Sequence, residues 1–226
     1  MGNGCSADPT DPSHIKIEYF GGGHGRPEPL RVMLHHAGIP FSNDDVSMTG
    51  WVWRKTINNT GEMGGLPIVH YQGKQMQQAM AVLRALGTEK GYYDPADWKK
   101  CAKIDWVCET WNDLLTGAGK ILFQFQGPAA AQAEWEEYCT TKWRPFLTKL
   151  EAQMAKDGTR FIGGDRPSIA DCVMFAAIHN MMMNPSFHCQ PFFRTEYEKY
   201  PTLVTYAQTI ETEFASFAAS REQLSM

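Results

Sequence analysis

The chain has 226 residues, of which 43% are hydrophobic and 20% are charged, and its formal net charge is −4. This balance is typical of a globular protein of one or two domains and excludes an intrinsically disordered chain. The acidic net charge, with no run of lysine or arginine longer than two, predicts no nucleic-acid partner.

The first thirteen residues are polar, contain two prolines and predict a flexible tail (1–13) without the apolar run of a secretory signal. Gly2 and Ser6 fit the N-myristoylation pattern, and Cys5 beside them offers a site for a palmitoyl group. Because one acyl chain holds a protein weakly and two hold it firmly, the pattern predicts association with a membrane surface. The alternative is a leader that matches a short pattern by chance.

Residues 14–91 alternate between strand and helix patterns. Strands are predicted at 14–20, 41–46, 66–71 and 74–76, and helices at 27–37 and from 79 onward, with an irregular or short helical stretch at 51–55. This β-α-β, β-β-α order predicts a small sheet covered by helices. A glycine- and proline-containing linker then leads into the second half of the chain.

Residues 97–226 are helical in character, with amphipathic segments at 98–123, 129–156, 168–183 and 201–221. Ser168 and Asp171 form a capping-box pattern ahead of the third segment. The six cysteines lack C-x-x-C and zinc-ligand spacings, so they indicate reduced thiols of a cytoplasmic protein and predict no metal site.

Six short motifs, in order and at fitting intervals, together resemble the cytosolic glutathione transferases, the sigma class in particular. They are Tyr19-Phe20, Gly25 to Glu28, Trp51 with Lys55, Leu66-Pro67, Gln78 to Arg84, and Ser168 to Asp171. The resemblance implies a thioredoxin-like α/β domain (14–91) and an all-α C-terminal domain (97–226). It also implies glutathione as co-substrate without a tightly bound cofactor, and a cytoplasmic homodimer that conjugates glutathione to small hydrophobic electrophiles in detoxification.

The resemblance also assigns roles to residues. Tyr19 would be catalytic and stabilise the glutathione thiolate, Pro67 would follow a cis peptide bond, and Glu109 would reach the partner subunit's glutathione. The residues implied to bind glutathione are Tyr19, Arg26, Trp51, Lys55, Gly65, Leu66, Pro67, Gln78, Ala79 and Glu109. Taken singly, several have a plainer interpretation: a tyrosine or tryptophan that packs in the core, a solvated lysine, and a trans proline that begins an edge strand.

Three departures from the family pattern favour an alternative function without significant catalysis. Ala79 replaces the usual serine, the glycine-rich loop 21–25 is one residue longer with His24 in place of an arginine, and Glu109 replaces an aspartate. The alternative is a scaffold or assembly subunit of the same fold with weak or no catalysis, tethered to a membrane. A thioredoxin-like redox protein ranks last, since no cysteine lies between Cys5 and Cys101. Prostaglandin isomerisation and lipid-peroxide reduction stay open as activities.

Overall fold

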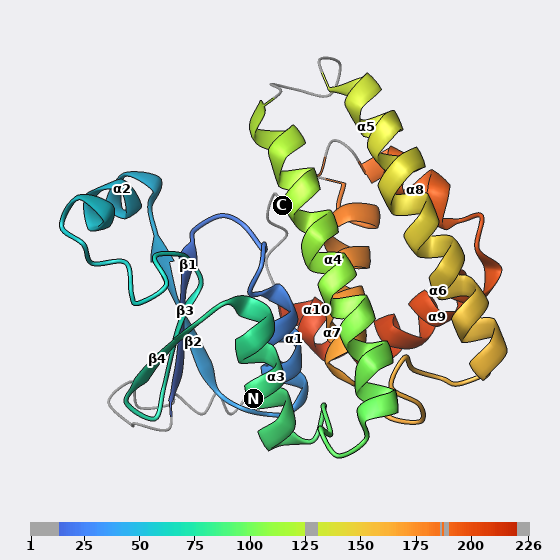
Figure 1. Ribbon diagram of the computed structural model, residues 1–226, viewed down its shortest axis with the longest axis horizontal. Coiled ribbons are helices and arrows are strands. Elements are labelled where there is room, and N and C mark those ends of the chain that lie inside the picture. The colour runs from blue at the N-terminus through green and yellow to red at the C-terminus, as the bar shows by residue number, and fades with distance from the viewer. Residues whose placement is uncertain (1–13, 125–130, 186, 188–189, 221–226) are drawn as a thin grey trace.

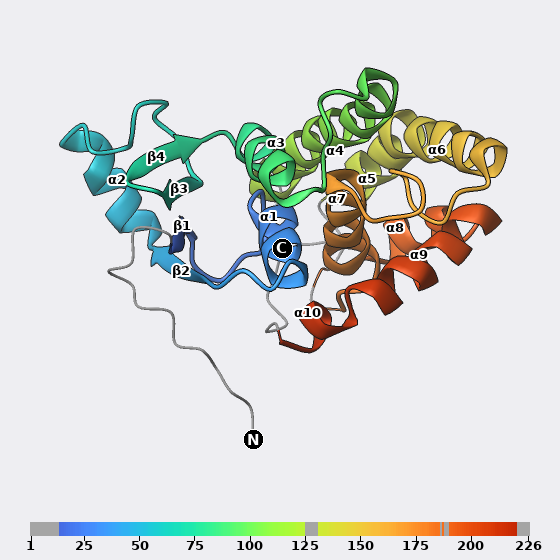
Figure 2. The ribbon, with the colours of Figure 1, turned by 90° about the horizontal axis from the view of Figure 1, so that it is seen from below.

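A computed structural model describes residues 14–124, 131–185, 187 and 190–220. The predictions for the tail at 1–13, with Gly2 and Cys5, and for the last residues of the chain lie outside this part. Figure 1 shows a small sheet at one end of the molecule and a bundle of helices at the other. Helices α1 (Glu28–His36) and α3 (Ala79–Lys90) lie between them, as the perpendicular view in Figure 2 confirms.

The sheet has four strands in the order β2-β1-β3-β4. Strands β1 (Ile15–Phe20) and β2 (Phe41–Val46) are parallel, whereas β3 (Ile68–Tyr71) and β4 (Lys74–Gln77) add antiparallel. Strand β3 begins at Ile68, two residues later than predicted. The reason is that Pro67 has no N–H to donate to a neighbouring strand. Helix α2 (Met48–Thr56) follows β2 and is longer than the stretch predicted from residue 51.

The remaining helices form the second half of the chain. They are α4 (Trp98–Gln124), α5 (Gln132–Tyr138), α6 (Arg144–Asp157), α7 (Ile169–Ala177), α8 (Gln190–Tyr197), α9 (Pro201–Glu213) and α10 (Ala215–Ser220). Two π-helical turns, η1 (Cys139–Trp143) and η2 (Ile178–Met182), join α5 to α6 and extend α7. The short α8 was not predicted, and the segment predicted at 201–221 is interrupted at Phe214.

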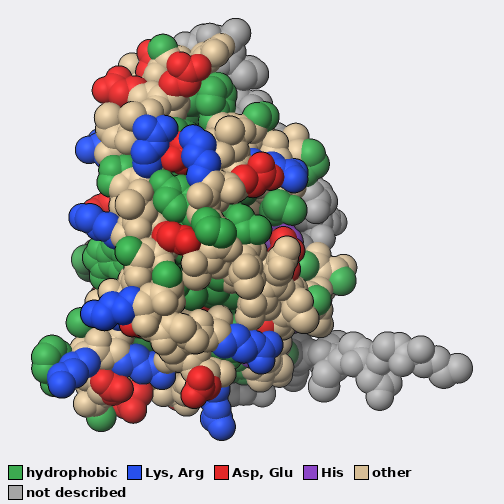
Figure 3. Space-filling model, turned by 90° about the vertical axis from the view of Figure 1, so that its right-hand side faces the viewer, with side chains coloured by type: hydrophobic (Ala, Val, Ile, Leu, Met, Phe, Trp, Pro, Cys, Tyr) green, Lys and Arg blue, Asp and Glu red, His purple; other side chains and the backbone are tan. Residues whose placement is uncertain are grey.

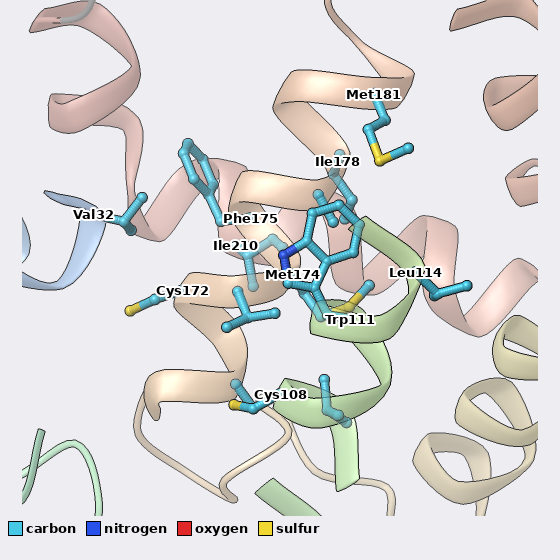
Figure 4. Close-up of a cluster of buried hydrophobic side chains, with 14 of the residues drawn as sticks. Val32, Cys108, Trp111, Leu114, Cys172, Met174, Phe175, Ile178, Met181 and Ile210 are labelled. Carbon is cyan, nitrogen blue, oxygen red and sulfur yellow. The ribbon is translucent and has the colours of Figure 1, made fainter. Parts of the chain in front are cut away.

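Helix α7 is the centre of the core, and all nine of its residues are buried. Figure 4 shows Trp111 of α4 packed beside Met174 and Ile178, with Ile210 of α9 nearby. The predicted capping box is present at its start, where the Asp171 carboxylate accepts bonds from the Ser168 N–H and hydroxyl, each at 2.7 Å. Since α1 and α4 both pack on α7, this helix fixes the position of the sheet against the helical bundle.

Candidate functional site

A cleft of about 540 Å³ opens where the loop before β3, the start of α3 and the middle of α4 meet. This volume is within the range of small-molecule sites, ~300–1,000 Å³. Seven residues predicted from the sequence line it: Arg26, Gly65, Leu66, Pro67, Gln78, Ala79 and Glu109. Tyr19, Trp51 and Lys55 are not among its lining residues. The cleft therefore contains seven of the ten residues predicted to bind glutathione, and the other three lie outside its lining.

One wall of the cleft is backbone. The Leu66–Pro67 peptide bond is cis, as the resemblance implied. The Gln77 side chain holds the preceding loop: its amide donates to the Gly65 carbonyl at 2.5 Å and to the Thr60 carbonyl at 3.0 Å, and its oxygen accepts from the Met63 N–H at 2.7 Å. Sequence reasoning missed Gln77, and its only signal was its place at the end of a short strand.

The start of α3 forms the adjoining wall. Gln78 precedes the helix with φ +69°, a backbone conformation that non-glycine residues rarely adopt, and Ala79 is the first helical residue. Residues with such strain are found at ligand-binding turns. The first amides of a helix have no partner within the helix, and together with the helix dipole they favour an anion. This end of the cleft therefore suits a carboxylate.

Tyr19 lies half-buried at the carboxyl end of β1, and its hydroxyl accepts a hydrogen bond from the Arg26 N–H at 3.4 Å. The ring sits against Gly25, where an added Cβ would lie 2.4 Å from the Tyr19 oxygen. A tyrosine hydroxyl that accepts one bond still has its own proton to donate. Because Arg26 both contacts this hydroxyl and lines the cleft, the phenol stands directly beside the cleft.

The Arg26 side chain links this turn to the helical domain. Its guanidinium donates to Asn112 Oδ1 at 2.6 Å and to Thr116 Oγ1 at 2.8 Å, both on α4. Asn112 and Thr116 also line the cleft, so this contact closes it on the side of the helical domain. The spacing of these residues, more than eighty positions apart, left this contact invisible in the sequence.

The glycine-rich loop after β1 contacts buried charged side chains of α1. Arg31 donates to the His24 carbonyl at 2.9 Å, to Glu28 Oε2 at 3.1 Å and to Asn43 Oδ1 at 2.8 Å, and the His24 ring lies 3.3 Å from Glu28. All three charged or titratable side chains are buried. The bond from Arg31 to the His24 carbonyl and the contact of the His24 ring with Glu28 therefore tie this loop to α1.

Trp51 and Lys55 lie together on α2. The indole is buried against Phe20 with rings nearly perpendicular, and the Lys55 ammonium lies 5.8 Å from the centre of the indole ring. Helix α2 is held to the sheet by Glu18, which pairs with Arg54 at 2.5 Å and with His70. Burial opposes ionisation of Glu18, but the hydrogen bonds from Arg54 and His70 outweigh it and lower its pKa.

Glu109 lines the far end of the cleft and pairs with Arg84 of its own chain. Arg84 also donates to Asp105 at 2.6 Å. Glu109 is about half-exposed, so its carboxylate faces both the cleft and the outside of the subunit. In the described part of the chain, no helix is long and apolar enough to cross a membrane, and no group of three His, Cys, Asp or Glu side chains is placed to hold a metal.

Comparisons with known proteins identify the family. The family "Glutathione S-transferase, C-terminal domain" matches residues 112–220. A glutathione S-transferase of Anopheles gambiae is 36% identical over 153 residues, which is 67% of this chain and 71% of that protein. The chain belongs to the cytosolic glutathione transferases. It is a glutathione S-transferase, an enzyme class with glutathione as its co-substrate.

Solved structures agree on the fold. Prostaglandin synthase D of Nilaparvata lugens superposes with a TM-score of 0.74 at 20% identity, covering 92% of this chain and 98% of that one. The monomeric glutathione S-transferase Na-GST-3 of Necator americanus gives 0.74 at 18% identity, covering 94% and 100%. The predicted fold class, a thioredoxin-like domain followed by an all-α domain, is confirmed.

Proposed function

We propose that this enzyme conjugates reduced glutathione to small hydrophobic electrophiles and that the Tyr19 hydroxyl stabilises the attacking thiolate. The observation that carries the proposal is the position of that hydroxyl, accepting from the Arg26 N–H at the edge of the cleft. Its remaining proton is available to a sulfur anion. A free thiol has a pKa of ~8.5, and each unit by which it falls corresponds to ~1.4 kcal/mol in favour of the thiolate.

The cleft supports a matching set of contacts for the tripeptide. The backbone of Leu66, which lines the cleft next to Pro67, would pair with the cysteinyl part as an added strand does. The amides at Gln78 and Ala79 would take the γ-glutamyl carboxylate. Gly65 keeps that wall open, with no heavy atom within 4 Å of an added Cβ. Residues 14–91 would form the glutathione-binding domain and residues 97–226 the helical one.

Three further residues complete the proposed site. Arg26, Trp51 and Lys55 would flank the glycyl end, the two cations supplying charge for its carboxylate. For Trp51 and Lys55 this requires α2 to approach the ligand, because neither lines the cleft as it stands.

Glu109 would act across a homodimer interface, since its carboxylate is about half-exposed at the edge of the cleft. The fold alone does not decide the oligomeric state, because the Necator americanus relative is described as monomeric. Sedimentation velocity on the purified chain tests the dimer: a single species of twice the chain mass supports it, and a monomer removes the role proposed for Glu109.

The electrophile would bind between the loop after β1 and the part of α4 that carries Asn112 and Thr116. The Nilaparvata lugens neighbour is described as a prostaglandin synthase, so prostaglandin isomerisation is the second activity to assay. Turnover with a general aromatic electrophile tests the first. If neither activity is found while glutathione binds, the chain functions as a scaffold of this fold.

The direct test of the mechanism compares Tyr19→Phe with the wild type. Tyr71→Phe is the matched control, because its hydroxyl donates to Glu89 on the surface at 2.8 Å, outside the cleft. We expect the thiolate absorbance of bound glutathione to titrate at higher pH in Tyr19→Phe and to be unchanged in Tyr71→Phe. Equal titration in all three proteins would refute the role of Tyr19.

We also propose that Gly2 is myristoylated and Cys5 palmitoylated in the cell, because residues 1–6 carry the sequence pattern for both. Intact mass measurement of the protein from its native cell tests this. Loss of Met1 together with the added mass of a myristoyl group is the expected result, and an unmodified N-terminus would contradict it.

A further inference from the structure

Helix α2 has apolar side chains on both its inner and its outer side. Trp51 points inward and is 5% exposed, whereas Met48 and Val52 are each 57% exposed, Trp53 is 64% exposed and Ile57, just after the helix, is 50% exposed. We call these four exposed residues the outer face of α2. A surface helix normally turns polar residues outward, so a helix that is apolar on both sides lacks a partner on one of them.

The residue composition of this face is typical of a helix that contacts lipid. Between Met48 and Asn59 the charged residues are Arg54 and Lys55, and none is acidic. Tryptophan is enriched at membrane–water interfaces because its ring is apolar and its N–H is polar. Apolar residues flanked by cations are the pattern of helices that lie in the interfacial plane of a bilayer.

The position of α2 in the fold allows such a contact. Both ribbon views place α2 at the outer end of the sheet, on the opposite side from the helical bundle, so a flat surface can approach it (Figures 1 and 2). The side of the helical bundle shown in Figure 3 is different, because acidic and basic side chains are interspersed across it among scattered apolar ones.

The segment before β1 is also long enough to reach the membrane surface that α2 would contact. Thirteen residues precede His14, and thirteen residues reach at most ~45 Å when extended. Strand β1 has six residues and spans ~20 Å, and α2 begins beyond its far end. An acyl group on Gly2 can therefore enter the same membrane surface that α2 contacts.

We propose that the outer face of α2 inserts into the interfacial layer of a lipid bilayer and acts as a second membrane contact beside the N-terminal acyl group. The proposal rests on the proposed acylation only for the strength of binding. A single acyl chain gives marginal, reversible attachment, and an apolar helical face adds affinity in proportion to the area that it buries. Because α2 also carries Trp51 and Lys55, the membrane contact and the proposed glutathione site share one helix.

The experiment measures flotation of the full chain with phosphatidylcholine vesicles, with and without phosphatidylserine. Protein is made with and without a co-expressed N-myristoyltransferase, and its intact mass is checked. We expect Trp53→Ser to lower the vesicle partition coefficient about tenfold, which corresponds to ~1.4 kcal/mol, in either form of the protein.

Trp98→Ser is the matched control, because Trp98 is also an exposed tryptophan, at 69%, and has the Lys99 ammonium 5.8 Å from its ring centre, but it lies on α4. Its partitioning should equal that of the wild type. Equal partitioning of the two variants, or no vesicle binding by the wild type in either form, would overturn the proposal. So would a concentration-dependent dimer that Trp53→Ser abolishes, because the face would then bind a second copy. An unmodified native N-terminus refutes the acylation alone and leaves the comparison of the tryptophans intact.

Discussion

Two carboxylates show how differently the two ends of this molecule are held. Asp171, at the start of α7, is fully buried and accepts bonds from the Ile162 N–H and the Tyr206 hydroxyl, each at 2.8 Å, besides those from Ser168. Glu18, on β1, holds α2 through side chains that are partly exposed. The core around α7 is therefore held by hydrogen bonds that are buried away from water. Helix α2 contacts the sheet along one side and is exposed on the other.

The cleft lies between these two regions. The residues proposed to bind glutathione likewise fall into two groups, one held firmly in the cleft and one on α2. The wall formed by Leu66, Pro67 and Gln78 is built from backbone that Gln77 holds in place. The residues that the resemblance adds from α2, Trp51 and Lys55, stand outside the cleft. We therefore expect changes near α7 to affect stability, changes in the backbone wall to affect glutathione binding, and changes at Glu18 to affect mainly the local order of α2.

The largest effect is expected from Asp171→Ala. The substitution leaves two backbone amides and two hydroxyls without their acceptor in a buried site, which should lower the free energy of unfolding by about 3–5 kcal/mol. Urea denaturation measures it. Asp165→Ala, at an exposed aspartate in the loop before α7, is the control and should change stability by less than ~0.5 kcal/mol. Similar losses of stability in both variants would contradict the role of α7 as the centre of the core.

Gln77→Ala should affect binding more than folding. It removes three hydrogen bonds that hold the loop from Thr60 to Gly65, so we expect glutathione affinity to fall about tenfold or more, ~1.4–2 kcal/mol, by calorimetric titration. The nearby Gln75→Ala, at an exposed residue of β4, should bind as the wild type does. An unchanged affinity in Gln77→Ala would show that the loop keeps its shape unaided.

Acid should loosen α2 before it unfolds the core. The pKa of Glu18 is lowered in the folded protein, so the pairs with Arg54 and His70 stabilise α2 fully above the ordinary value of 4.5 and lose their effect as the pH falls through the lower, folded value. Hydrogen exchange of the α2 amides, corrected for intrinsic rates, should rise below about pH 4.5 in the wild type. In Glu18→Gln the exchange should already be raised at neutral pH, by an amount equivalent to about 1 kcal/mol, without that acid-dependent rise. Acid-dependent exchange of the same size in both proteins would contradict this role.

The smaller of the two changes in glutathione affinity is expected from Ala79→Ser, which restores the residue usual in the family. A serine hydroxyl at the start of α3 can donate to the glutathione carboxylate, and in a solvated cleft this should raise affinity roughly fivefold, ~1 kcal/mol. Ala81→Ser, two residues along the same helix, is the control. A gain in both variants would show that polarity in the cleft, rather than a bond at this position, is responsible.

The sequence predicted the features that depend on neighbouring residues. Alternation in β1, helical spacing in α3 and the capping box at Ser168 are local patterns, and Leu66-Pro67 carried its cis bond through a family resemblance. The contacts of Gln77 and Arg26 were not predictable, because they join segments that only the folded chain brings together. Helix α8 was missed for a different reason: it has eight residues, too few for a clear period.

The central claim is that the Tyr19 hydroxyl stabilises the glutathione thiolate, and the most direct measurement is the ultraviolet titration of the thiolate in the binary complex. In the wild type the bound thiol should titrate at least one pH unit below free glutathione, and Tyr19→Phe should remove most of that shift while still binding glutathione. Should Tyr19→Phe bind glutathione and titrate as the wild type does, another group ionises the thiol and the proposed mechanism is wrong.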